Sequence, residues 1–223
     1  MRNKFEKQLE QLNEELTHMG ELCVTAIGKA AEALGEGSIS KAEEMIAADE
    51  EIDQMEKEIE RMCLKLLLHQ QPVARDLRQI SAALKMITDM ERIGDQAADI
   101  AEIILSANMT EGADIEEISA MAAGVSKMVA NSVEAYVKKD LVLAKEVIDA
   151  DDTIDEMFDS IKFNLMRRVA EGNQGELAID LIMVTKYLER IGDHATNIAE
   201  WVEFSITGVH IDQNEGEKWG ETS

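Results

Sequence analysis

The sequence has 223 residues, and its 22 basic and 46 acidic side chains give a formal net charge of −24. The acidic excess argues against nucleic-acid binding and against adhesion to anionic lipid, because both depend on Lys and Arg contacting phosphates. With one Pro and 4% aromatic residues, the composition excludes an all-β fold and favours helices, since Ala, Leu, Glu, Met and Lys dominate.

The order of helix-breaking and capping residues predicts an all-α chain of six long helices. Ser40 and Glu43 resemble a capping box at the start of the second helix. Pro72 suits the first turn of the third helix, Asp114 to Glu117 is a plausible cap for the fourth, and Asp140 starts the fifth. The expected ranges are 4–34, 40–70, 73–107, 114–138, 141–171 and 176–206.

The chain is an internal duplication. Residues 48–55 reappear as 150–157, and residues 91–102 reappear as 189–200 with nine of the twelve positions identical. Apolar residues on these helices recur at steps of three and four, which is typical of an antiparallel bundle. We therefore expect two tandem antiparallel three-helix bundles, with domain boundaries at 1–110 and 111–207 and a flexible polar tail at 208–223.

No apolar run in the sequence approaches the length of a membrane-spanning helix. The first residues turn polar again too soon for a signal peptide. The two cysteines, Cys23 and Cys63, lie far apart without a Cys-x-x-Cys motif, so we expect buried, reduced thiols. Together these features predict a cytoplasmic protein with no direct membrane insertion and no nucleic-acid partner.

Acidic residues spaced four apart are the main feature that both copies retain. Such residues lie on one helix face, where like charges destabilise a helix by roughly 0.2–0.5 kcal/mol per pair. Gly94 and Gly192 each add about 1 kcal/mol relative to Ala inside a helix. A bound cation would offset the charge repulsion, and close approach of backbone or a metal would explain the glycines. The candidate metal ligands are Asp49, Asp53, Glu91, Asp95, Asp99, Asp151, Asp155, Glu189 and Asp193.

Carboxylates alone form a hard ligand set, which suits magnesium, calcium, manganese or iron better than thiolate-bound zinc. His194 lies within the second motif, but Gln96 replaces it in the first, so it is at best an auxiliary ligand. A simpler alternative is that the acids are solvated, or are neutralised by Arg92 and Arg190 as ordinary ion pairs. No nucleotide-binding loop or nucleophile motif is present, so we expect no catalytic residues, although a dinuclear-metal enzyme on a helical bundle is the alternative reading.

The duplicated segment Glu91–Glu102 and its copy Glu189–Glu200, together with the acidic pairs on the preceding helices, resemble the PhoU family of bacterial phosphate-transport regulators. The segment 71–78, Gln-Pro-Val-Ala-Arg-Asp-Leu-Arg, resembles the family's opening of the third helix. The resemblance extends from about residue 5 to about residue 206. Arg75 and Arg78 have no basic counterparts in the second copy, and either contact a partner or pair with nearby acids.

The resemblance implies a cytoplasmic, all-helical, often homodimeric protein that is not an enzyme. It implies a negative regulator of the phosphate-starvation response that links the ATPase subunit of a phosphate ABC importer to a sensor histidine kinase, at the inner face of the membrane. It also implies clusters of metal ions, including iron or zinc, held by the carboxylates. Asp49, Asp53, Glu91, Asp95 and Asp99 would form the first cluster, and the remaining four acids the second. Asn197 replaces the last acid of the second motif.

Overall fold

The computed structural model describes residues 2–69, 73–109, 115–172 and 175–209, and it contains all six predicted helices. No strand occurs within these ranges. The all-α prediction is confirmed, with helix ends within a few residues of those expected. The helices are α1 (Arg2–Glu36), α2 (Ile39–His69), α3 (Ala74–Ser106), α4 (Glu116–Lys138), α5 (Leu141–Ala170) and α6 (Gly175–Thr207).

Two of the predicted helix caps can be compared with the structure. Asp140 caps α5 as predicted, because its Oδ1 accepts hydrogen bonds from the backbone N–H groups of Val142 and Leu143 at 3.0 and 3.1 Å. The capping box at Ser40 is wrong. The chain turns at Gly37, whose φ is 62°, and Ser38 Oγ then accepts from the N–H of Lys41 at 3.4 Å. The predicted roles of Pro72 and Asp114 lie outside the described residues, as does most of the expected tail at 208–223.

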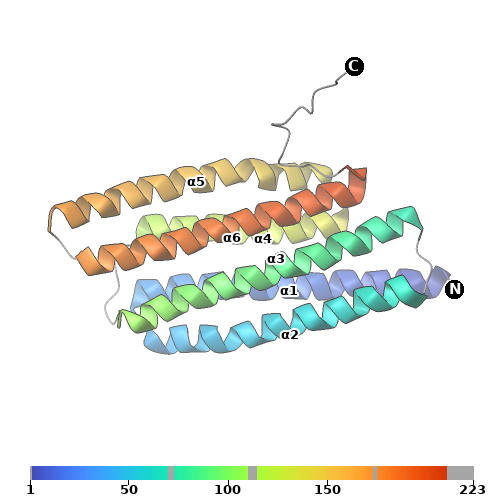
Figure 1. Ribbon diagram of the computed structural model, residues 1–223, viewed down its shortest axis with the longest axis horizontal. Coiled ribbons are helices and arrows are strands. Elements are labelled where there is room, and N and C mark those ends of the chain that lie inside the picture. The colour runs from blue at the N-terminus through green and yellow to red at the C-terminus, as the bar shows by residue number, and fades with distance from the viewer. Residues whose placement is uncertain (1, 70–72, 110–114, 173–174, 210–223) are drawn as a thin grey trace, which may run out of the picture.

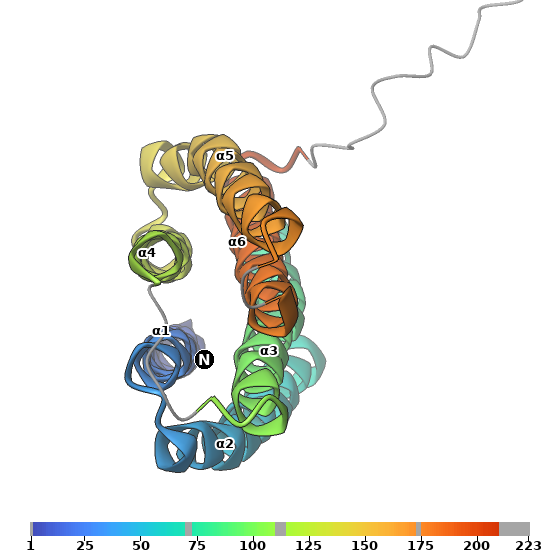
Figure 2. The same ribbon diagram turned by 90° about the vertical axis from the view of Figure 1, so that its left-hand side faces the viewer.

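The two three-helix units, α1–α3 and α4–α6, pack into one elongated bundle. Viewed along its length, α1, α3, α4 and α6 surround the centre, while α2 and α5 flank it at opposite edges (Figure 2). The units join where α3 packs against α6 and α1 against α4. The two inner helices α3 and α6 run antiparallel (Figure 1), so the duplicated segments cross near their middles. Within the described ranges, no helix is long and apolar enough to span a membrane.

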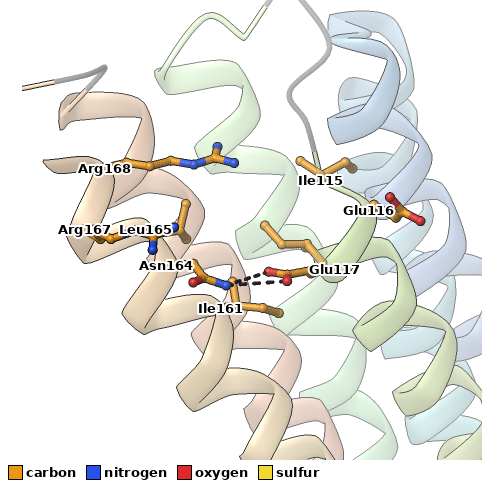
Figure 3. A pocket seen from close by; sticks show the side chains of 9 residues that line it. Ile115, Glu116, Glu117, Ile161, Asn164, Leu165, Arg167 and Arg168 are labelled. Atoms are coloured by element: carbon orange, nitrogen blue, oxygen red, sulfur yellow. Dashed lines mark hydrogen bonds between the residues drawn. The ribbon is translucent and has the colours of Figure 1, made fainter. Parts of the chain in front are cut away.

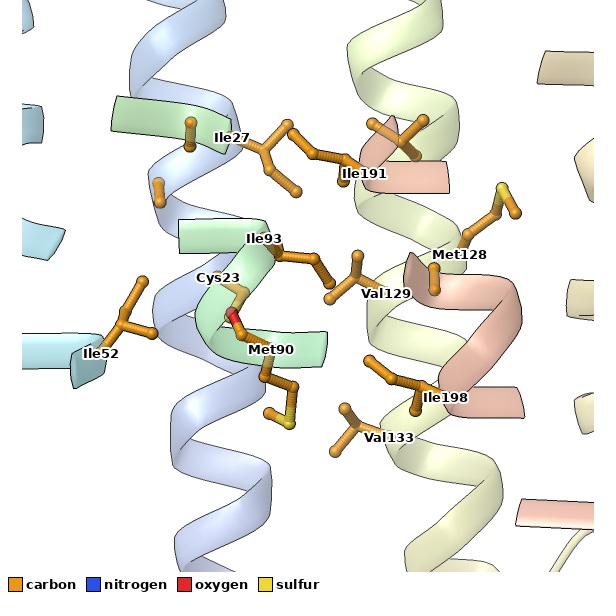
Figure 4. Close-up of a cluster of buried hydrophobic side chains, with 14 of the residues drawn as sticks. Cys23, Ile27, Ile52, Met90, Ile93, Met128, Val129, Val133, Ile191 and Ile198 are labelled. Carbon is orange, nitrogen blue, oxygen red and sulfur yellow. The ribbon is translucent and has the colours of Figure 1, made fainter. Parts of the chain in front are cut away.

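The core lies at this crossing. Ile93 of α3 and Ile191 of α6 are equivalent positions of the duplicated segment, and both are fully buried. Ile93 points toward Val129 of α4, and Ile191 points toward Ile27 of α1 (Figure 4). Cys23 lies close by on α1 and donates its thiol to the Met90 carbonyl at 3.3 Å. Cys23 and Cys63 are free and buried, as the sequence predicts. The duplicated segment is therefore fixed on its apolar face by the core, which leaves its acidic face directed outward.

Candidate metal centre

Three of the candidate acids converge in the groove between α2 and α3. Asp49 and Asp53 are one turn apart on α2, and Asp95 comes from α3. Each offers one carboxylate oxygen such that the three atoms lie within 4.8 Å of one another. All three side chains are half-buried. Oxygens at this separation can bind the same cation, because each metal–oxygen distance would be about 2.0–2.6 Å.

Gly94 explains how an acid of α2 comes so close to α3. A Cβ atom at this position would lie 2.7 Å from Asp49 Oδ1 and 3.0 Å from Ile52 Cδ1, which is closer than atoms of this kind normally approach. The missing side chain therefore makes room for the carboxylate and for the isoleucine beside it. The protein atoms that approach Gly94 most closely are therefore side-chain atoms of α2.

The carboxylate of Asp49 is poorly compensated. Burial, followed by the charges of Asp95, Asp53 and Asp99, raises the pKa of Asp49 from 3.8 to about 6. Its Oδ1 is shielded from solvent and has no hydrogen-bond partner among the described residues. Burial and Asp95 also raise the pKa of Glu91. A buried oxygen without a donor, next to other negative charges, fits a site that takes a cation.

Basic side chains partly neutralise the other acids of this cluster. Arg92 bridges Asp95 and Glu91, with Nη1 3.1 Å from Asp95 Oδ2 and Nε 3.5 Å from a Glu91 oxygen. Lys57 lies 3.6 Å from Asp53. Both bases are more than half exposed, and exposed pairs contribute only about 0–1 kcal/mol. Three of the acids therefore form ordinary ion pairs, as the simpler alternative predicts. Asp49 has no basic partner in the described part of the chain.

Asp99 lies at the edge of the cluster. Burial and Glu102 raise its pKa, while Tyr187 and Arg190 of α6 lower it. Its side chain is thus shared between the first cluster and the contact of α3 with α6. Its charge still contributes to the raised pKa of Asp49, so it acts on the centre through the electric field.

The four acids of the second copy also gather, but less closely. Burial, followed by Glu189 and Asp151, raises the pKa of Asp193 to about 6. Burial, and then Asp155 among the neighbouring carboxylates, raises the pKa of Asp151. Within the described ranges, however, the oxygens of this set do not converge as those of the first set do. Lys186 Nζ lies 2.6 Å from Glu189 Oε1, so this acid has a basic partner, as its equivalent Glu91 has in Arg92.

The space around the equivalent glycine of the second copy is also less crowded. The nearest atom to a Cβ at Gly192 would be Ile154 Cγ2 at 3.3 Å, and Asp151 Oδ1 would be 3.8 Å away. The carboxylate of Asp151 therefore lies farther from α6 than Asp49 lies from α3. The two copies share the residue pattern but differ in how tightly the acids are seated.

The structure also shows a partner of His194 and Asn197 that the sequence did not reveal. Asp89 of α3 reaches across to α6, where its Oδ1 lies 2.9 Å from His194 Nδ1 and accepts a hydrogen bond from Asn197 Nδ2 at 3.2 Å. His194 and Asn197 thus join the two units at this contact. The signal was weak, because the counterpart of Asp89 in the second copy is Tyr187 and the acidic pattern does not include it.

A separate pocket of about 290 Å³ lies where the start of α4 meets the end of α5. Its polar centre is a contact between Asn164 and Glu117, in which Nδ2 donates to Oε2 at 3.3 Å (Figure 3). Arg167 and Arg168 also line it. None of the nine acidic candidates lines it, so it is not an entrance to the candidate centre.

Comparison with known proteins gives a consistent result. The PhoU domain model matches residues 16–104 and again residues 118–202, so each match contains one copy of the acidic motif. A curated relative from Clostridium acetobutylicum, named phosphate-specific transport system accessory protein PhoU homolog, is 39% identical over 96% of this chain and 99% of its own length. A homolog of the same name from Aquifex aeolicus is 38% identical over 84% of this chain and 86% of its own.

Two solved structures share the fold over nearly the whole chain. The crystal structure of PhoU from Pseudomonas aeruginosa matches with a TM-score of 0.86 and 31% identity, covering 92% of this chain and 100% of that one. The phosphate transport system regulatory protein PhoU from Streptococcus pneumoniae matches with a TM-score of 0.86 and 25% identity, covering 93% of this chain and 99% of that one.

Proposed function

This chain belongs to the PhoU family, and on that basis we propose that it is an accessory protein of a phosphate-specific transport system. It regulates phosphate uptake from the cytoplasmic side of the membrane and represses the phosphate-starvation response when phosphate is plentiful. It does so as an adaptor that binds two partners, the ATPase subunit of a phosphate ABC importer and a sensor histidine kinase. The names of the full-length relatives support the transport role, and the name of the structure from Streptococcus pneumoniae supports the regulatory one.

We also propose that the acidic clusters bind metal ions. The observation that carries this is the convergence of Asp49, Asp53 and Asp95, with one buried oxygen lacking a donor. A cation bound there would supply the positive charge that the groove lacks and would tie α2 to α3. Magnesium, manganese and iron fit carboxylate oxygens best, with zinc as a further candidate. The acids of the second copy form a weaker site, because their oxygens converge less closely within the described residues.

A genetic test addresses the regulatory role. Deleting the gene in its own host is expected to switch on phosphate-starvation genes in phosphate-rich medium, and the wild-type gene on a plasmid is expected to restore repression. Uptake of radiolabelled phosphate, measured in the same strains, separates an effect on transport from an effect on transcription. Unchanged expression and unchanged uptake in the deletion strain would contradict the proposed function.

A binding test addresses the adaptor. The purified ATPase subunit and the cytoplasmic part of the kinase are each titrated with the full chain by calorimetry, with and without added Mn²⁺. Binding of both supports an adaptor, whereas binding of neither contradicts it. Light scattering on the same samples gives the mass of the free protein, for which we propose a homodimer.

The convergent carboxylates leave one rival function, a dinuclear-metal enzyme. Such an enzyme loaded with Mn²⁺ or Fe²⁺ would hydrolyse a phosphoester or consume oxygen, and would lose that turnover when Asp49 and Asp95 become Ala. The matched control replaces Glu43 and Glu44, two exposed acids of α2 away from the cluster. Turnover that disappears only in the first variant favours the enzyme, and its absence in the loaded wild type favours the adaptor.

A further inference from the structure

One part of this acidic chain carries the opposite charge. Residues 61–85 hold five of the 22 basic side chains and one of the 46 acidic ones. In the structure residues 61–69 end α2 and residues 74–85 begin α3, at one end of the bundle (Figure 1). We call the described residues 61–68 and 73–85 the α2–α3 end. Its basic residues are Arg61, Lys65, Arg75, Arg78 and Lys85, and its acid is Asp76.

The same end exposes large apolar side chains. Leu68 is 77% exposed, Val73 is 66% exposed, and Leu77 and Leu64 are 47% and 45% exposed. All four lie within three turns of the junction between α2 and α3. Scattered single apolar side chains on a surface are ordinary, but a gathered group marks an interaction surface. The α2–α3 end is thus apolar and basic at once.

The basic residues at the start of α3 interact unfavourably with the dipole of their own helix. The positive end of the helix dipole lies there, and it favours anions over Arg75 and Arg78. Val73 at the N-cap offers no side-chain hydrogen bond. Arg78 Nε is shielded from solvent without a hydrogen-bond partner among the described residues, and neither arginine has an ion pair there. An external anionic group would suit this helix end and would pair with the exposed side chain of Arg75.

A further cation comes from α4. The hydroxyl of Tyr136 donates to the Gln79 carbonyl at 2.8 Å and anchors the end of α4 to α3. Lys139, one turn later, has a backbone φ of 56°. Burial and then the charge of Arg75 lower the pKa of Lys139, while Asp76 raises it. Cations from two helices therefore gather around one acid, in a chain whose acids outnumber its bases two to one.

We infer that the α2–α3 end is a docking surface for a partner-protein segment whose carboxylates flank an apolar stripe. The basic residues would pair with the carboxylates, and Leu64, Leu68, Val73 and Leu77 would bury the stripe. The inference rests on the proposed function only in requiring that the chain works by binding other proteins. It adds which surface binds, and the chemistry of the segment that is bound.

An anionic membrane surface would have similar chemistry but is disfavoured. The net charge of −24 opposes approach to anionic lipid, and acids resume on α2 directly before this end, at Glu58 and Glu60. A short protein segment contacts the basic area without bringing the rest of the chain against a charged plane. The lipid case is kept as an outcome of the test.

The test uses the full chain in its own cells, with a photo-crosslinking phenylalanine analogue at Leu68. The matched control carries the analogue at Phe163, which is 67% exposed near the opposite end of the bundle. Mass spectrometry identifies the attached segment. The inference predicts adducts at Leu68 with a segment that combines Asp or Glu with apolar residues, and fewer such adducts at Phe163. No adduct at Leu68, an adduct with lipid, or a segment without acids would overturn it.

A second measurement uses the partner found in this way, in purified form. Arg75→Glu together with Arg78→Glu is expected to weaken its binding about ten-fold or more, and the wild-type affinity is expected to fall as salt rises. The charge-matched control is Lys127→Glu together with Arg167→Glu, two exposed positions elsewhere. The first variant should fold normally, because acids at the start of α3 suit the helix dipole. Equal weakening by both variants would contradict the inference.

The docking surface and the proposed function can be refuted independently of each other. If Leu68 attaches to a segment of the predicted chemistry but the deletion strain keeps normal expression and uptake, the docking surface stands and the proposed function fails. If the importer ATPase or the kinase attaches at Phe163 and not at Leu68, the proposed function stands and the docking surface fails.

Discussion

Replacing Gly94 with Ala tests how the first acidic cluster is built. A Cβ at this position would lie 2.7 Å from Asp49 Oδ1 and 3.0 Å from Ile52 Cδ1, so the substitution must push α2 side chains away from α3. Gly192→Ala is the matched control, because it occupies the equivalent position in the second copy and its nearest neighbour would be 3.3 Å away.

The expected free energies follow from two opposing effects. Ala is favoured over Gly in a helix interior by about 1 kcal/mol, and this gain applies to both variants. Overpacking a buried site costs about 1–3 kcal/mol, and this cost applies mainly to Gly94→Ala. We therefore expect Gly94→Ala to lower the free energy of unfolding by about 0–2 kcal/mol and Gly192→Ala to raise it by up to about 1 kcal/mol.

Urea unfolding of the metal-free proteins measures these differences, and calorimetric titration with Mn²⁺ measures the consequence for the cluster. Displacing the Asp49 carboxylate is expected to weaken Mn²⁺ binding about ten-fold, comparable to the loss of a group that orients a metal ligand. Gly192→Ala should bind with the affinity of the wild type at the first cluster. If both variants have the same stability and the same Mn²⁺ affinity, the proposed seating of Asp49 against Gly94 is wrong.

Three further predictions concern charge and hydrogen bonding. Asp49→Asn should stabilise the metal-free protein, and the gain should grow with pH: because the folded-state pKa of Asp49 is raised from 3.8 to about 6, the stability linked to its proton is present below about pH 4 and is lost as pH rises through 6. The gain at pH 7 should be on the order of 1 kcal/mol after solvent screening, measured by urea unfolding from pH 4 to 8; a gain that does not change with pH would contradict it. Asp89→Ala should cost about 1–2 kcal/mol, because His194 loses its partner across the contact of α3 with α6; thermal unfolding checks this, and an unchanged Tm would show that the contact contributes nothing. Tyr136→Phe should cost about 1–2 kcal/mol, because the buried Gln79 carbonyl loses its donor; hydrogen exchange at the start of α3 should increase, and exchange like that of the wild type would argue against an anchor there.

The sequence was sufficient for the fold because the relevant signals are local. Helix-forming composition, sparse glycine breaks and the duplicated segment determine six helices in two units, and Asp140 caps α5 as its residue type predicts. The start of α2 was misplaced, since Ser38 and Ser40 are both acceptable caps and the backbone at Gly37 decides between them.

The candidate site was less predictable because its geometry depends on contacts between helices. The acids were found from their spacing, yet spacing cannot show that Asp95 reaches Asp49 while Asp99 lies beside Tyr187. The difference between the copies was also invisible in the repeated motif itself. It depends on how far each acid lies from the facing glycine.

Metal content per chain tests the central claim most directly, which is that the converging carboxylates bind metal ions. The protein is purified without a metal-affinity column or chelator and measured by mass spectrometry, beside a variant in which Asp49 and Asp95 become Ala and the Glu43 and Glu44 control. We predict metal in the wild type and in the control, and a clear loss in the variant while its circular dichroism remains helical. A wild type without metal, or a variant that retains the full content, would contradict the account.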